Sequence, residues 1–346
     1  MFTALPEIIL LGGGGTIASQ SPNSLEAIKY DKRADPGSLP RLNIEAVVER
    51  VPELKKVVKL KWTTEIEQDT YIPSTTTWLL CFAHAILEID PEIGVVVTLG
   101  TNILSELAFL LDLVLDRPGP VVVTGSMRPI SAISSDGQYN LVQACSLAGS
   151  QAARGRGVLV VLNDRISSGY YVSKVSANRM DTFRTHEQGQ LGIFANYTPH
   201  FFYEPARPTN KPYFDIGDHR TLPFVVVVYC YVDIPSDALD KAASDPLVEG
   251  IVLAGFGDAL PPFALVNSAE SLAIQGLPIV RTSIQADSLA ARYTTFRPSH
   301  INQIAAGHLG PAKSKIMLQL ALLKYGRNIE KIREAFGTQS LMPVVL

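Results

Sequence analysis

Short apolar runs rich in β-branched residues alternate along the first half of the chain with longer segments of helical spacing. The runs predict strands at residues 8–11, 57–62, 95–97, 121–124 and 158–162. The segments between them predict helices at residues 42–51, 74–87, 103–114 and 140–149. Strands that alternate with helices of about 10–15 residues indicate crossover units. We therefore expect an α/β domain built on a mainly parallel sheet.

The alternation fades between residues 196 and 223, where five prolines lie among polar residues. It resumes beyond them, with predicted strands at 224–232, 250–253 and 278–281 and helices at 236–243, 268–275, 315–323 and 329–336. The pattern thus predicts a larger N-terminal α/β domain over residues 1–203 and a linker over residues 204–223. A smaller C-terminal α/β domain is predicted over residues 224–346.

Composition narrows the class of protein. A length of 346 residues fits about two domains. The net charge of −3 provides no basic surface for nucleic acid. The longest apolar run has nine residues, whereas a membrane-spanning helix needs about 20, and the N-terminus lacks the basic start of a secretory signal. Cys81, Cys145 and Cys230 are interpreted as buried thiols of a reducing compartment. We expect a cytoplasmic protein without nucleic-acid or membrane partners.

Two glycine-threonine turns follow predicted strands. Thr16 comes after the run Gly12–Gly15, and Thr101 comes directly after Gly100. Because open α/β sheets bind ligands at the carboxyl ends of their strands, two hydroxyls at such positions indicate a catalytic centre. Residues 13–18 also satisfy the G-x-G-x-x-A form of the dinucleotide fingerprint. That motif alone is weak, and the region 29–36, where a second strand should end in an acidic residue, has the character of a loop.

A threonine nucleophile needs a neighbouring base. The six histidines lie in no recognisable motif, and no closely spaced His/Cys set suggests a metal. Lys174, just past the strand at 158–162, is the best candidate base, although a single loop lysine is more often a surface residue. Tyr30 is the one aromatic residue in the polar loop 19–39. Two interpretations of Tyr30 are equally good: its ring anchors the loop to the core, or it acts in catalysis.

An ordered series of motifs covers nearly the whole chain. It comprises Gly14-Gly15-Thr16-Ile17-Ala18, Gly100-Thr101 with Glu106, Gly125-Ser126-Met127-Arg128-Pro129, Ser135-Asp136-Gly137 with Asn140, Asn163-Asp164, Lys174, Thr182-Phe183, Gly189-Gln190-Leu191-Gly192, Gly255-Phe256-Gly257 and Leu318-Gln319-Leu320-Ala321-Leu322. This series resembles the bacterial-type L-asparaginase and glutaminase-asparaginase family. The resemblance implies a two-domain α/β fold without a cofactor, and hydrolysis of the side-chain amide of Asn or Gln through a threonine acyl-enzyme.

The resemblance also assigns roles to residues. Thr16 matches the nucleophile, Tyr30 the loop tyrosine that activates it, and Thr101 and Lys174 the second threonine and the lysine of the proton-handling group. Backbone N–H groups near the two turns would stabilise the oxyanion. Further positions are expected to bind substrate: Asp69, Thr70, Gly100, Asn102, Ser126 and Asp258. The family forms homodimers or homotetramers with active sites between subunits, and the same assembly is expected here.

Three departures from the family pattern concern substrate recognition. Asn102 replaces the aspartate that grips the substrate's α-ammonium, and asparagine lacks its charge. Asp69 lies where a serine usually holds the α-carboxylate; it would repel that group but could capture an ammonium from the other side. Asp258 replaces an asparagine, and the acid that a partner subunit normally supplies has no obvious match between residues 288 and 307.

Three functions are therefore compatible with the sequence. The preferred one is an amide hydrolase that acts on L-asparagine or a related carboxamide. The first alternative is a biosynthetic enzyme on the same scaffold that carries out acyl transfer, cyclisation or elimination on a tailored metabolite. The second alternative is a catalytically inactive binding protein.

Overall fold

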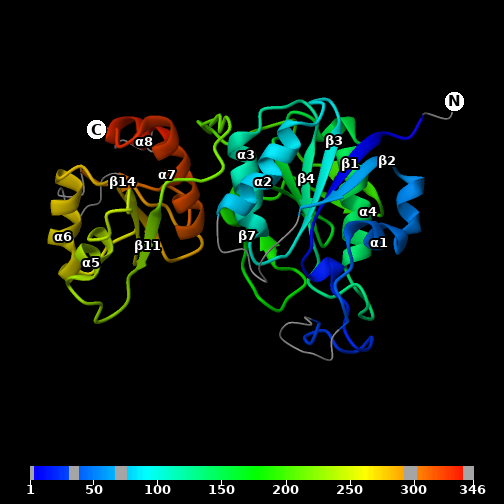
Figure 1. Ribbon diagram of the computed structural model, residues 1–346, viewed down its shortest axis with the longest axis horizontal. Coiled ribbons are helices and arrows are strands. Elements are labelled where there is room, and N and C mark those ends of the chain that lie inside the picture. Colours follow the sequence, from blue (N-terminus) through cyan, green and yellow to red (C-terminus); the bar gives the residue numbers. More distant parts are fainter. Residues whose placement is uncertain (1–3, 31–38, 67–75, 292–301, 338–346) are drawn as a thin grey trace. The chain divides into compact units, whose positions relative to one another are not determined.

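The chain forms two compact units, residues 1–207 and 208–346. A computed structural model describes residues 4–30, 39–66, 76–291 and 302–337. The segment assigned above to a linker, residues 204–223, spans the division between the units. Each unit is described by itself below (Figure 1).

The first unit is organised around an eight-stranded sheet, in the order β10-β9-β6-β5-β4-β3-β1-β2 within the described residues. These strands are β1 (Glu7–Gly13), β2 (Lys59–Glu65), β3 (Gly94–Leu99), β4 (Val121–Thr124), β5 (Val158–Leu162), β6 (Arg165–Ser168), β9 (Gly192–Ala195) and β10 (Thr198–Phe201). Strands β1 to β5 pair in parallel, whereas β6, β9 and β10 extend the sheet in antiparallel pairings. Two short strands, β7 (Ser173–Lys174) and β8 (Phe183–Arg184), form a separate antiparallel pair.

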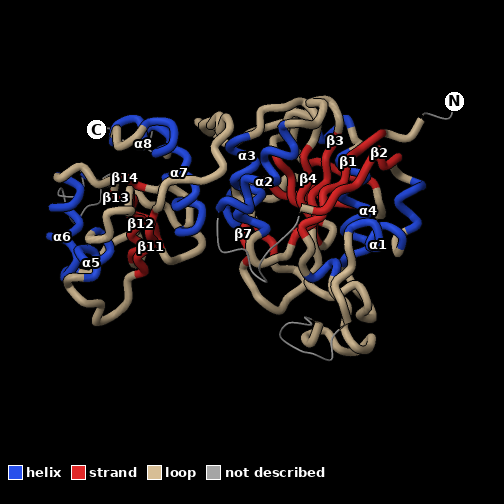
Figure 2. The backbone as a smooth tube through the Cα atoms, in the orientation of Figure 1, coloured by secondary structure: helices blue, strands red, loops and turns tan. Residues whose placement is uncertain are grey.

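Helices flank this sheet (Figure 2). They are α1 (Ile44–Glu49), α2 (Thr76–Leu87), α3 (Leu104–Val114) and α4 (Gly137–Ala148), with 3-10 turns η1 (Thr16–Ala18), η2 (Pro52–Lys56), η3 (Gln151–Ala153) and η4 (His186–Gln188). Side chains of α1, η2 and α4 share one buried cluster with alternate residues of β1 and β3, such as Ile8, Leu10 and Val96. The intervening residues of those strands are also buried. Burial on both faces explains why the central strands are continuous apolar runs.

The second unit repeats the α/β arrangement on a smaller scale. Its described strands run in parallel in the order β11-β12-β13-β14. The elements are β11 (Val225–Tyr229), α5 (Ala238–Ala243), β12 (Gly250–Gly255), α6 (Phe263–Ile274), β13 (Ile279–Ser283), β14 (Ile304–Ala305), α7 (Pro311–Tyr325) and α8 (Ile329–Ala335). The predicted fold class, a larger N-terminal and a smaller C-terminal α/β domain, is confirmed.

Some local predictions were wrong. Cys81 is exposed, whereas Cys145 and Cys230 are buried as expected; in α2 the neighbours Leu80 and Phe82 take the buried positions instead. Lys174 belongs to β7 and not to a loop. No helix in the described ranges has both the length and the apolar character required to cross a membrane.

Candidate functional site

The two glycine-threonine turns lie against each other. Strands β1 and β3 are parallel neighbours, with Gly13 opposite Leu99, so both turns leave the sheet at its carboxyl edge. Gly15 has φ +87°, and a Cβ atom placed on it would lie 2.3 Å from the Cα of Gly100. Contact this close is possible only because Gly15 has no side chain. It brings the starting points of Thr16 and Thr101 together.

We expect Gly15→Ala to lower the free energy of unfolding by about 2–4 kcal/mol, because it adds left-handed backbone strain and a clash with Gly100. Gly276→Ala is a matched control: Gly276 has φ +88°, but nothing lies within 4 Å of its added Cβ. Gly276→Ala should lower the free energy of unfolding only by the cost of the strained backbone. Urea unfolding of both variants measures the difference. Equal destabilisation would contradict the close packing of the two turns.

Thr16 begins the 3-10 turn η1 and is 9% exposed. Its hydroxyl Oγ1 donates a hydrogen bond to the phenolic oxygen of Tyr30 at 3.4 Å. Fourteen positions separate the two residues, so the intervening loop must fold back over the turn. The structure thus places the predicted nucleophile beside the predicted loop tyrosine.

The loop between them is attached to a second segment of the same unit. The backbone N–H of Ile130 donates to the carbonyl of Ser19 at 3.0 Å, and that of Ile133 donates to Ser24 at 2.7 Å. The N–H of Ser21 donates to the Ser131 hydroxyl at 2.8 Å. These bonds hold residues 19–24 in place and thereby restrict where the following residues up to Tyr30 can reach.

Lys174 faces the second turn. Its Nζ donates hydrogen bonds to Thr101 Oγ1 at 2.9 Å and to Asn102 Oδ1 at 3.2 Å. Burial lowers the pKa of Lys174, because a less hydrated environment disfavours the ammonium form, while the charge of Glu106 raises it in part. A lysine with a lowered pKa, bonded to a hydroxyl, can accept and return a proton.

Ser126 borders the same edge, just beyond β4. A Cβ on Gly125 would lie 3.5 Å from the Cγ2 methyl of Thr101, and one on Gly137 would lie 3.1 Å from the Cβ of Ser126. Ser126 is fully buried, and its hydroxyl donates to the carbonyl of Arg128 at 2.7 Å. That hydroxyl is therefore engaged in holding the turn.

Two carboxylates support the site without having been predicted as site residues. Glu106 is the anion that acts on Lys174. Asp136 accepts backbone N–H bonds from Met127 and Arg128, which fixes the turn that carries Ser126. Burial raises the pKa of Asp136, and these N–H bonds oppose that effect. Both residues occur in the motifs quoted above, but their roles depend on contacts that spacing does not reveal.

The structure brings seven of the predicted site residues to one edge of the first unit: Thr16, Tyr30, Gly100, Thr101, Asn102, Ser126 and Lys174. Asp69 and Thr70 lie outside the described residues. Asp258 is exposed in the second unit, where it acts electrostatically on the buried Arg281. Its expected part in substrate binding stays a prediction, as do the individual roles of all these residues.

The described residues contain no group of three or more His, Cys, Asp or Glu side chains that could hold a metal ion.

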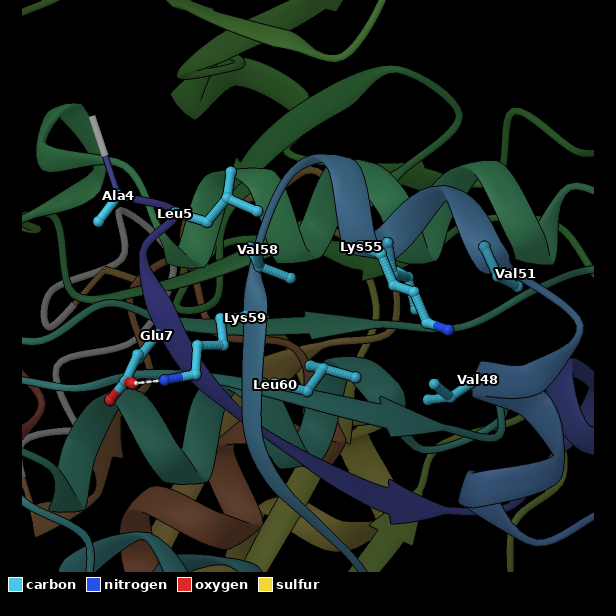
Figure 3. A pocket seen from close by; sticks show the side chains of 10 residues that line it. Ala4, Leu5, Glu7, Val48, Val51, Lys55, Val58, Lys59 and Leu60 are labelled. Carbon is cyan, nitrogen blue, oxygen red and sulfur yellow. Dashed lines mark hydrogen bonds and ion pairs between the residues drawn. The ribbon is translucent and has the colours of Figure 1, made fainter. Parts of the chain in front are cut away.

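An apolar pocket of about 770 Å³ lies elsewhere in the first unit, lined by residues such as Leu5, Val51 and Leu60, with the Glu7–Lys59 ion pair at its side (Figure 3). It borders the start of β1, whereas Thr16 follows the end of that strand. The pocket is therefore separate from the candidate site.

Comparisons with known proteins agree with this arrangement. Residues 7–207 match the family model described as Asparaginase, N-terminal, and residues 224–336 match the Glutaminase/Asparaginase C-terminal domain. The chain is 36% identical to L-asparaginase 2-3 of Saccharomyces cerevisiae, over 97% of this chain and 91% of that protein. It is 31% identical to L-asparaginase 2 of Escherichia coli, over 96% and 93%.

A solved structure is similar along nearly the whole chain. It is that of a probable cytoplasmic L-asparaginase from Campylobacter jejuni, with a TM-score of 0.81, 28% identity, and coverage of 96% of this chain and 99% of the other. Both family models, the full-length relatives and the shared two-domain fold agree. The chain belongs to the asparaginase family.

Proposed function

We propose that the protein is a threonine-dependent amide hydrolase that converts a small carboxamide into the corresponding acid and ammonia. The observation that carries this proposal is the meeting of Thr16–Tyr30 with Thr101–Lys174 at one sheet edge. Amide hydrolysis through an ester intermediate requires a hydroxyl nucleophile and a base, and Thr16 and the lysine with a lowered pKa, Lys174, can supply them.

In the first step the Thr16 hydroxyl attacks the amide carbon. The C–O bond forms, the C–N bond breaks, and the proton from Thr16 leaves with the nitrogen as ammonia. Lys174 accepts that proton through the Thr101 hydroxyl and returns it to the leaving nitrogen. Backbone N–H groups of the two turns stabilise the oxyanion. In the second step a water molecule adds to the ester, the bond to Thr16 breaks, and a proton from water restores the Thr16 hydroxyl.

We expect ammonia release when the full-length protein is screened against L-asparagine, L-glutamine, asparagine-containing peptides and simple primary amides. With a slow substrate, intact-mass spectrometry should show an acyl adduct that maps to Thr16. Hydroxylamine should divert the same intermediate to a hydroxamate. A metabolite that changes without releasing ammonia would contradict the hydrolase and favour the biosynthetic alternative.

We also propose that the active species is a cytoplasmic homodimer or homotetramer with sites completed between subunits. Support comes from apolar side chains exposed on and beside the edge strand β11: Phe224, Tyr229, Tyr231 and Val232 are 49%, 56%, 56% and 81% exposed. Clustered exposed apolar residues commonly mark protein interfaces. A stable and fully active monomer in gel filtration would contradict this assembly.

A further inference from the structure

The side-chain amide of Asn102 has a defined orientation. Lys174 Nζ donates to the carbonyl oxygen Oδ1 of Asn102 at 3.2 Å. Because a lysine ammonium has three donors and no acceptor, it can bond only the oxygen end of the amide. If Lys174 loses a proton, its lone pair can accept from the Thr101 hydroxyl while an N–H stays on Asn102. The orientation of the amide is therefore the same in both protonation states.

This orientation determines what Asn102 offers to a substrate. With Oδ1 bound to Lys174, the two N–H bonds of Nδ2 point away from the lysine, and no hydrogen bond of Nδ2 is found within the described ranges of the chain. Asn102 is exposed, so these donors are accessible. An α-ammonium group also has only donors. It would meet only N–H bonds at this position, from Nδ2 and from the neighbouring Lys174 Nζ.

The neighbouring anion does not replace the missing acceptor. Glu106 acts on Lys174, and its Oε2 accepts a hydrogen bond from the Ser105 hydroxyl at 2.9 Å. This carboxylate is therefore already hydrogen-bonded to Ser105. A substrate oxygen at the same place would instead accept a hydrogen bond from Nδ2.

We propose that Asn102 selects ω-amides of dicarboxylic acids that carry a hydroxyl or keto oxygen on the carbon next to the carboxylate, in place of a free α-ammonium group. This inference rests on the proposed amide hydrolysis and names its substrate class. The amide is still cleaved by Thr16, but the molecule that is recognised is a hydroxy- or oxo-acid amide and not a free amino acid.

Three substrates that differ in one substituent test the proposal: L-asparagine with an ammonium, succinamate with a hydrogen, and 2-hydroxysuccinamate with a hydroxyl. For the wild-type protein we expect kcat/KM to be about 10–100-fold higher for 2-hydroxysuccinamate than for L-asparagine, the size of one hydrogen bond gained and one mismatch avoided. Succinamate should lie between them.

Substitutions at Asn102 should change this order. Asn102→Asp presents a carboxylate and should reverse the preference toward L-asparagine. Asn102→Ala removes the donors and should bring 2-hydroxysuccinamate and succinamate to within about threefold of each other. Asn267→Asp introduces the same charge at an exposed position of α6 and serves as the control; its substrate order should match the wild type.

Calorimetric binding to the full-length Thr16→Ala protein separates this inference from the proposed function. Tighter binding of 2-hydroxysuccinamate than of L-asparagine, lost in Thr16→Ala/Asn102→Ala, supports the inference even if no amide is cleaved. If the wild type prefers L-asparagine, another group such as Asp69 binds the ammonium. That result would overturn the inference about Asn102 but would leave the proposed amide hydrolysis intact. Absence of binding by all three compounds would also overturn it.

Discussion

Thr16→Ala is expected to lower kcat for ammonia release by about 10³–10⁵-fold, because it removes the only atom that can form the ester intermediate in the proposed mechanism. Thr16 is 9% exposed, and within the described ranges its side chain hydrogen-bonds only to the Tyr30 hydroxyl. Its loss should therefore leave the fold intact. Steady-state ammonia release, together with urea unfolding, separates the catalytic effect from any loss of stability.

Thr16→Ser provides the matched comparison. Serine keeps the hydroxyl but lacks the methyl group that restricts rotation about Cα–Cβ, so we expect a reduction of about tenfold with the acyl adduct retained. If Thr16→Ala kept wild-type turnover while Thr16→Ser did not, the nucleophile would have to be sought elsewhere at the same edge, with Thr101 the first residue to test.

Lys174→Met is expected to lower kcat by about 10²–10⁴-fold, the usual contribution of a positioned general acid–base group. Methionine has a similar length but can neither hold nor release a proton. kcat should fall more than KM rises, because Lys174 acts on the proton through Thr101 and affects substrate binding only through Asn102. A loss confined to KM would show that Lys174 serves binding and not proton transfer.

The pH profile gives a second measurement of the same group. Lys174 must be neutral to accept a proton, so kcat/KM should rise with pH through the pKa of Lys174, which burial lowers. Glu106 raises this pKa in part. Glu106→Gln should therefore move the rising limb to lower pH. Asn102→Asp, which adds a carboxylate next to Nζ, should move it to higher pH. Shifts in the opposite directions would contradict Lys174 as the base.

Much of the fold could be predicted because the central strands are buried on both faces and therefore form uninterrupted apolar runs. The antiparallel extension was not predicted. Its strands β6, β9 and β10 are four residues long. β6 and β10 mix polar with apolar side chains, and β9 consists of Gly-Ile-Phe-Ala with alternate residues exposed. Such segments resemble loops until neighbouring strands pair with them.

The candidate site was only partly predictable for a different reason. The turn at Thr16 is visible in the glycine run, but Lys174 meets Thr101 across 73 positions, and no local pattern specifies that contact. The family resemblance supplied it. The bond from Asp136 to the Ser126 turn and the influence of Glu106 on Lys174 required the folded arrangement, since each is defined by burial and by partners outside its own segment.

The backbone contact between Gly15 and Gly100 has a consequence for engineering substrate scope. Two turns that touch through main-chain atoms cannot be lengthened or shifted independently, so loop grafting at either one would disturb both threonines at once. The side chain of Asn102, in contrast, is exposed and takes no part in the contact between the glycines. Variation in a directed-evolution library is therefore best restricted to side chains around position 102, with both glycine-threonine turns kept constant.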